Sequence, residues 1–316
     1  MERVVAIGDQ PVRLGASDVR RATALERLLG ALPDSTAAPL LSLSYRREGP
    51  ALPARPPDVR SMQLELWFDG PELHAREVSG LSARVAGGEA WIGGVTLDLV
   101  GGADSLLLSV LAHLMFPRER YVMHAGAVSL RGRARLLLGG SGMGKSSVTY
   151  GAHRAGWEVL GDDTVMLRPP GTGADWEVGA LSMKPLAVPA ELLVNGAVGE
   201  EPAGGVPRRR HDLPEPVLRP GWAEVGGIVS IEHGAEPGGR VEARDRRSAL
   251  AALLRSFPGA VNPALLPELF SVAHTLASRP AHLLAQGRDP SLRLRDVAAC
   301  LEELSESAGA GERPSP

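Results

Sequence analysis

A glycine-rich stretch in the middle of the chain has the residue types and the spacing of a phosphate-binding loop. It reads Gly139-Gly140-Ser141-Gly142-Met143-Gly144-Lys145-Ser146-Ser147, which fits the pattern G-x-x-x-x-G-K-[ST]. Glycines let the backbone curve so that several N–H groups converge on phosphate oxygens, and the helix that follows adds the positive end of its dipole. We therefore expect these nine residues to bind a nucleotide, with Lys145 on the outer phosphates and Ser146 on Mg²⁺.

Lysine is rare in this chain. Of the 34 basic residues only Lys145 and Lys184 are lysine, and the others are arginine. A compact ammonium fits inside a phosphate loop where a branched guanidinium would crowd it, which gives a reason for lysine at position 145. Lys184 follows the expected catalytic strands and is a weaker candidate for contact with nucleotide or substrate. The alternative for both is drift in an arginine-rich chain.

Two adjacent acids, Asp162 and Asp163, follow a predicted strand over 157–160. Neighbouring side chains at a strand end face different directions, so the two carboxylates can take different roles. One can hold Mg²⁺, directly or through water, and the other can accept a proton from an attacking hydroxyl. The alternative is an acidic turn without function, but the phosphate loop upstream favours a functional pair.

His124 precedes the loop within an apolar run over 122–130. Taken alone, it is more simply interpreted as a buried structural histidine. Beside a carboxylate and a phosphate its cationic form would be favoured, and the ring would then add positive charge in a transition state.

These motifs, taken in their order, resemble a known enzyme family. The run Met123-His124-Ala125-Gly126-Ala127-Val128 is followed by the phosphate loop within 134–147 and by the two acids within 156–165. This order is similar to the catalytic core of the HPr serine kinase/phosphorylases and their broader HPr-kinase-like relatives. The nucleotide site of those enzymes looks like that of phosphoenolpyruvate carboxykinases. The resemblance continues weakly to about residue 305.

The resemblance implies a role for each polar residue. Asp163 corresponds to the acid that accepts the proton of the substrate hydroxyl, Asp162 to its neighbour on the metal side, and His124 to the histidine that supports the acid and the phosphate. It also implies ATP and Mg²⁺ as cofactors and a homo-oligomer. Because the acids are adjacent, a swap of their roles stays open. In the divergent HPr-kinase-like branch, some members phosphorylate a precursor serine in peptide natural-product pathways such as those of lasso peptides. We therefore expect a serine of a small protein or peptide as the acceptor.

The chain also departs from the HPr kinases proper. Those enzymes carry an acidic residue directly after the serine of the loop, where this chain has Ser147. Nothing between Asp163 and Arg219 matches their downstream Glu-Ile-Arg-Gly signature, which contributes a metal carboxylate and is linked with phosphorolysis. We therefore expect a kinase without the reverse reaction, acting on an acceptor other than HPr.

The elements that position these residues divide the chain near residue 100. Before it, alternating apolar runs and turns predict strands over 4–7, 40–45, 63–68, 72–77, 83–85 and 90–97, with a helix over 17–32. After it, the pattern predicts helices over 103–115, 145–155, 247–256, 263–278 and 296–305, and strands over 122–130, 134–138, 157–160, 164–167 and 227–232.

The predicted fold class is therefore α/β. Residues 1–100 would form a β-rich N-terminal module, and residues 101–306 a P-loop kinase core of the HPr kinase/phosphoenolpyruvate carboxykinase type. Residues 307–316 would be a disordered tail. The soft segment over 197–216, which includes Arg208-Arg209-Arg210-His211, is expected to be a solvated loop unless it clamps a phosphate or an acidic peptide.

Composition excludes several classes of protein. The 316 residues carry 34 basic and 37 acidic side chains, a formal net charge of -3, which argues against a nucleic-acid partner. No apolar run reaches the roughly 18–20 residues of a membrane span, and the N-terminus lacks a secretory pattern. A single cysteine, Cys300, excludes an intramolecular disulfide and favours a cytoplasmic location.

Three functions fit these observations. The first is an ATP- and Mg²⁺-dependent kinase that phosphorylates a hydroxyl. The second is a nucleotide-binding regulatory or scaffold protein that has lost phosphotransfer, which the missing downstream signature favours and the Asp162-Asp163 pair with His124 opposes. The third is a kinase for a small metabolite.

Overall fold

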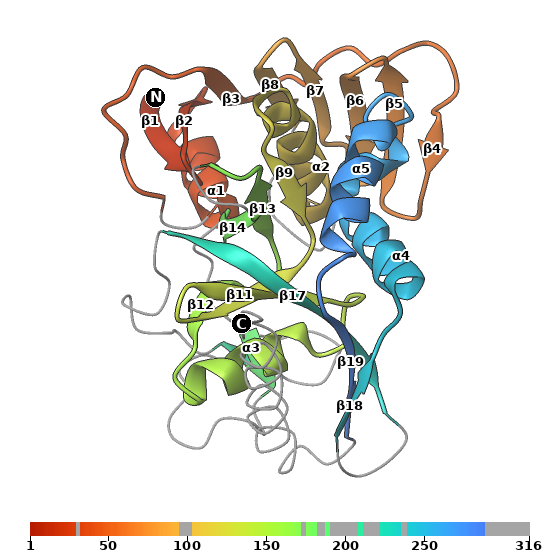
Figure 1. The fold of residues 1–316 in the computed structure, drawn as a ribbon. Coiled ribbons are helices and arrows are strands. Elements are labelled where there is room, and N and C mark those ends of the chain that lie inside the picture. Colours follow the sequence, from red (N-terminus) through yellow and green to blue (C-terminus); the bar gives the residue numbers. More distant parts are fainter. Residues whose placement is uncertain are drawn as a thin grey trace.

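The computed structural model describes residues 1–29, 32–94, 103–171, 175–181, 187–189, 208–210, 221–234 and 239–287. Within them the chain is a mixed α/β protein built on two large sheets, one above the other in Figure 1. The expectations for Lys184, Cys300, the helix over 296–305 and the tail over 307–316 lie outside the described residues.

The first sheet is formed by residues before position 94. In sheet order its described strands are β1 (Glu2–Ile7), β2 (Gln10–Ala16), β3 (Leu41–Arg46), β8 (Glu89–Gly93), β7 (Ser82–Ala86), β6 (Glu72–Glu77), β5 (Leu64–Asp69) and β4 (Val59–Arg60). Helix α1 (Val19–Leu29) packs against β2 and β3. Helix α2 (Ala103–Met115) packs against β6 and β7, because its side chains are apolar around most of its circumference. The hydrophobic core beside this sheet therefore contains residues that come before and after position 100 in the sequence. The domain boundary that we predicted near residue 100 stays a prediction.

The second sheet carries the glycine-rich loop. In sheet order its described strands are β12 (Glu158–Gly161), β10 (Gly126–Leu130), β11 (Arg133–Leu138), β17 (Trp222–His233), β14 (Glu177–Ala180), β13 (Val165–Arg168) and β9 (Tyr121–Met123). Strand β19 (Ala281–Gln286) pairs with β17, and β18 (Arg240–Ala243) pairs with β19. The neighbours β11, β17 and β19 are parallel, so their carboxyl ends meet at one edge.

Helices cover both faces of this sheet. Helix α3 (Lys145–Arg154) packs on one face, where Leu137 of β11 meets Val148. Helices α4 (Arg246–Ser256) and α5 (Leu266–Leu276) lie on the other, where Leu136 shares a core with Leu253 and Leu269. Side chains alternate across a strand, so the apolar run of β11 supplies both cores at once.

A charged cluster joins the two sheets. Asp9, in the turn between β1 and β2, accepts hydrogen bonds from Arg120 at 2.6 and 2.8 Å and from Arg168 at 3.0 Å. Arg168 also bonds Glu177 at 2.6 Å, and its guanidinium lies 4.2 Å from the ring centroid of Trp222. Burial alone would raise the pKa of Asp9, but these hydrogen bonds outweigh it and lower the pKa to about 2.

The structure corrects some expected elements. The predicted strand over 122–130 is two strands, β9 and β10, because the backbone N–H of His124 donates to Ser256 at 2.7 Å instead of to a strand partner. Strands β2, β4, β14, β15, β18 and β19 were not expected. Arg208–Arg210 is strand β16, paired with β15 (Ala187–Pro189), which satisfies backbone groups that a loop would leave to solvent. None of the described helices combines the length with the apolar character needed to cross a membrane.

Candidate functional site

The glycine-rich loop connects the end of β11 to the start of α3, at the edge where β17 and β19 also end. The tip of this loop, Gly140 to Gly142, which we call its crest, is exposed. A turn forms there, in which Met143 N donates a hydrogen bond to Gly140 O at 3.2 Å. Gly144 caps the helix with a φ of +93°, a conformation that favours glycine. No side chain caps α3. Its first-turn N–H groups therefore face the loop as an anion-binding end.

Lys145 fills the hollow of this loop. Its side chain is only 5% exposed, and Nζ donates to Gly139 O at 2.8 Å and to Gly140 O at 3.4 Å. Burial lowers the pKa of Lys145, although the nearby charge of Asp163 opposes this shift. The ammonium is thus held where phosphate oxygens could replace the two carbonyls as partners.

Asp162 lies directly beside the first turn of α3. Asp162 follows β12, which pairs with β10. Gly126, the first residue of β10, lies so close that a Cβ on it would be 2.8 Å from the Asp162 carbonyl oxygen. Only glycine permits this close approach. Ser146 Oγ donates to Asp162 Oδ2 at 2.9 Å. The other oxygen, Oδ1, is buried without a hydrogen-bond partner in the described residues.

These two residues fit a cation site that phosphate oxygens would complete. Burial raises the pKa of Asp162 to about 7, the negative charge of Asp163 adds to that shift, and the bond from Ser146 opposes it. A buried carboxylate with an unused oxygen beside a hydroxyl is a donor set suited to Mg²⁺, which keeps waters and substrate phosphates as its other ligands. In the described residues no three His, Cys, Asp or Glu side chains group into a metal site of their own.

Asp163 and His124 stand at the mouth of the loop. Asp163 Oδ1 lies 3.7 Å from Lys145 Nζ and 3.5 Å from His124 Nδ1, and this side chain is 66% exposed. Lys145 Nζ is also 3.2 Å from His124 Nε2. The two adjacent acids thus have different partners, Ser146 for Asp162 and the Lys145–His124 pair for Asp163.

The ionisation of His124 differs from the sequence-based expectation. Burial lowers its pKa, the charge of Asp163 raises it and the charge of Lys145 lowers it further, with a net decrease. The cationic form that we expected beside a carboxylate is therefore not favoured in the chain by itself, because desolvation outweighs the attraction of Asp163.

The remaining predicted residues occupy the loop and the first turn of the helix. Ser141 is on the exposed crest. Ser147 is 3% exposed and lies on the buried side of α3, so its side chain does not face the open crest. Its backbone N–H, in the first turn of the helix, is the group with which it can bind an anion.

Two residues beside the loop were missed by the sequence analysis. Gln286 Nε2 donates to Gly144 O at 3.0 Å, and His233 Nε2 lies 3.1 Å from Gly142 O. Both stand at the ends of strands parallel to β11. No local motif indicates them, because their proximity depends on strand order.

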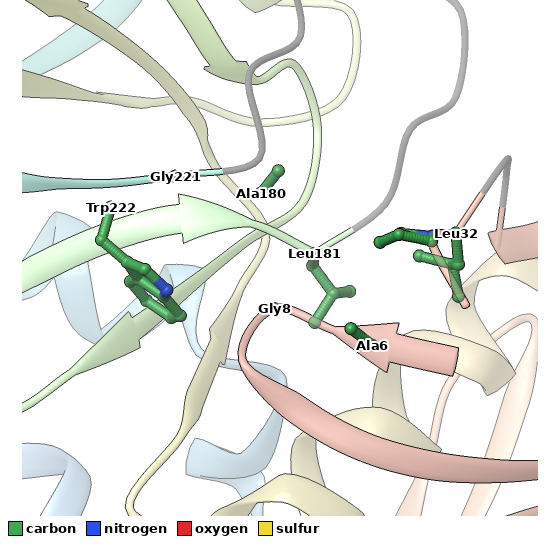
Figure 2. Close-up of a pocket in the computed structure, with 8 residues that line it drawn as sticks. Ala6, Gly8, Leu32, Ala180, Leu181, Gly221 and Trp222 are labelled. Atoms are coloured by element: carbon green, nitrogen blue, oxygen red, sulfur yellow. The ribbon is translucent and has the colours of Figure 1, made fainter. Parts of the chain in front are cut away.

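A pocket of about 190 Å³ lies elsewhere, at the junction of the two sheets. Figure 2 shows Ala6 and Gly8 from the β1–β2 hairpin facing Leu181 and Trp222. None of its lining residues is charged. It adjoins segments outside the described residues, and we assign no ligand to it.

No protein-family model and no curated protein sequence matches this chain. Among solved structures, the HPr(Ser) kinase/phosphatase from Coxiella burnetii aligns over 59% of this chain and 98% of its own, with 12% sequence identity and a TM-score of 0.30.

Proposed function

We propose that this chain is an ATP- and Mg²⁺-dependent kinase with a P-loop core of the HPr-kinase-like type. It transfers the γ-phosphate to a hydroxyl, with a serine of a small protein or peptide as the acceptor. The observation that carries the proposal is the convergence of Lys145, His124 and Asp163 at the mouth of the phosphate loop, beside the Ser146–Asp162 pair.

Each residue has a role that its surroundings support. The loop N–H groups and the start of α3 bind the phosphates, and Lys145 exchanges the carbonyls of Gly139 and Gly140 for phosphate oxygens. Asp163 accepts the proton of the acceptor hydroxyl. The hydroxyl oxygen forms a bond to the γ-phosphorus, the bond from phosphorus to the β–γ bridging oxygen breaks, and ADP leaves with that electron pair.

Ser146 and Asp162 would hold Mg²⁺, which supplies positive charge against the phosphates when bound. His124, whose Nδ1 lies 3.5 Å from Asp163 Oδ1, orients this carboxylate. Because Asp163 is 66% exposed, a hydroxyl on a protein or peptide can reach it without an internal channel.

The partners and location remain part of this proposal. We propose a homo-oligomer in the cytoplasm, with no nucleic-acid or membrane partner. None of these features is needed for the chemistry at the loop.

The test has two stages. Calorimetry would first measure ATP binding with and without Mg²⁺. Phosphate transfer from labelled ATP to an array of serine-containing peptides would then be compared between the wild-type chain and Asp163→Asn. Transfer that requires Asp163 is the expected result. ATP binding without transfer to any acceptor or to water would instead favour the nucleotide-binding regulatory protein, and transfer only to small alcohols would favour a metabolite kinase.

A further inference from the structure

The carbonyl of Gly144, the last glycine of the phosphate loop, has two donors. Val148 N donates at 3.1 Å from the first turn of α3, and Gln286 Nε2 donates at 3.0 Å. Gln286 is the last residue of β19, 142 positions further along the chain, and is 3% exposed. The loop is therefore anchored from outside by a strand that is distant in sequence.

The amide of Gln286 occupies the space that a side chain at position 144 would need. A Cβ built on Gly144 would lie 2.5 Å from Oε1 and 2.6 Å from Nε2 of Gln286. Glycine is thus required there for two reasons, the φ of +93° and the contact with this amide. The fit indicates that Gly144 and Gln286 work as a pair.

The contact controls where the neighbouring N–H group points. In a planar trans peptide the C=O of Gly144 and the N–H of Lys145 point in opposite directions. The Gly144 carbonyl is held toward α3, where it also accepts from Val148 N. The Lys145 N–H, which has no partner within the helix, therefore points back toward the loop, where phosphate would bind. We propose that Gln286 is a positioning residue that presets the phosphate loop for its anion, an inference that rests on the proposed function.

Stability alone does not explain a glutamine at this position. Its Oε1 is buried without a hydrogen-bond partner in the described residues, and such an acceptor is destabilising. An apolar side chain of similar size would suit the fold at least as well. The glutamine contributes a donor aimed at one loop carbonyl, which is of use only if the geometry of the loop matters.

His233 makes a second contact of the same kind. Its Nε2 donates to Gly142 O at 3.1 Å from the end of β17, the strand between β11 and β19. His233 is exposed, so water competes for this bond, and its effect is smaller than that of Gln286.

The experiment compares two ligands in matched variants. Calorimetry in the presence of Mg²⁺ would measure the affinities for ATP and for inorganic tripolyphosphate, alongside the unfolding temperature. In Gln286→Leu and Gln286→Glu both affinities should fall about tenfold, because one oriented hydrogen bond to the loop is lost. His233→Ala should lower both by about two- to threefold. The unfolding temperature of Gln286→Leu should not fall, because the substitution also removes the unpartnered oxygen.

The matched control is Gln10→Leu. Gln10 also donates one hydrogen bond, to Asp9 Oδ1 at 2.9 Å, but lies at the sheet junction, so neither affinity should change. A loss for ATP alone would overturn the proposal, because Gln286 would then contact the nucleoside. Unchanged affinities in both Gln286 variants would overturn it as well. A wild-type chain that binds neither ligand would instead remove the proposed function, and this inference with it.

Discussion

Nζ of Lys145 lies 3.2 Å from Nε2 of His124. An ammonium has only donors, so this ring nitrogen must be the acceptor. The proton of the neutral ring is therefore on Nδ1, which faces Asp163 Oδ1 at 3.5 Å. The buried lysine thereby sets the tautomer of the histidine, and the histidine in turn presents an N–H group to the exposed carboxylate.

Replacing Lys145 separates ligand binding from folding. Lys145→Ala should weaken ATP binding about 10- to 100-fold, because charge-assisted hydrogen bonds to the phosphates are lost. The fold should tolerate the change, since burial already disfavours the charged lysine. Calorimetry and thermal unfolding would measure the two effects. Equal ATP affinity in wild type and variant would refute the role of the loop.

The exposed acid should act in chemistry and not in binding. Asp163→Asn keeps the size of the side chain but cannot accept a proton, so transfer should drop about 10²–10⁴-fold while ATP affinity stays within a few-fold. The readout is the rate of phosphate transfer at saturating ATP.

Asp162→Asn is the matched control for Asp163, one residue away but bonded to Ser146. It should raise the Mg²⁺ concentration needed for half-maximal activity, because a carboxylate ligand is lost. If Asp162→Asn abolishes transfer with normal Mg²⁺ dependence while Asp163→Asn stays active, the roles are swapped. If both variants transfer normally, the active site lies elsewhere.

A buried histidine far from the loop should make stability depend on pH. His113 Nδ1 donates to Ser109 O at 2.9 Å and Nε2 accepts from Asn262 at 3.2 Å, which fixes a neutral ring. Burial lowers its pKa to about 4, with the Ser109 contact opposing, while the unfolded chain keeps about 6.5. Above pH 6.5 the ring is neutral in both states, and burial of His113 does not reduce the free energy of unfolding. As the pH falls from 6.5 toward 4, the unfolded chain binds a proton that the folded chain does not, and the free energy of unfolding decreases by about 3 kcal/mol.

Urea unfolding between pH 7 and pH 4 checks this effect. His113→Leu should be less stable at pH 7 and should show a flatter pH dependence in this window. His274→Gln, at an exposed histidine, should keep the wild-type slope. An unchanged slope in His113→Leu would show that another group carries the transition.

Asp9, in the charged cluster between the two sheets, should make stability depend on pH over a lower range than His113 does. The folded pKa of Asp9 is about 2 against 3.8 for the ordinary side chain, so its contribution is complete above pH 4 and disappears as pH falls toward 2. Asp9→Asn should cost about 2 kcal/mol at pH 7 and progressively less below pH 4. Glu72→Gln, in an exposed pair with Arg84, should change stability by less than about 1 kcal/mol. A constant cost of Asp9→Asn at all pH values would contradict the linkage.

Local patterns predicted the parts of the fold that depend on local chemistry. The expected helix over 103–115 matches α2 because its apolar side chains continue over three turns. The glycine-rich loop was expected between a strand and a helix, and it lies between β11 and α3, because its glycines and lysine form one contiguous motif. These features need no knowledge of distant residues.

Other features depend on strand order, which short patterns do not contain. Strand β2 carries Pro11 and Gly15, which interrupt its alternation, and β19 is a run of six residues in which His282 interrupts the apolar side chains. Gln286 was therefore not associated with the loop. The net pKa decrease of His124 was missed for a related reason, since burial depends on the packing of whole elements.

One strand connects the two regions that these predictions address. Strand β17 crosses the second sheet (Figure 1). Its twelve residues begin at Trp222, on whose ring Arg168 stacks, and end at His233, beside the glycine-rich loop. At about 3.3 Å per residue this is a distance of roughly 40 Å. Amide protons in the middle of a sheet exchange with solvent only when the sheet opens. The amides of β17, from the junction of the two sheets to the loop, should therefore exchange as one cooperative unit. A ligand bound at the loop should slow deuterium uptake along β17 as far as Trp222.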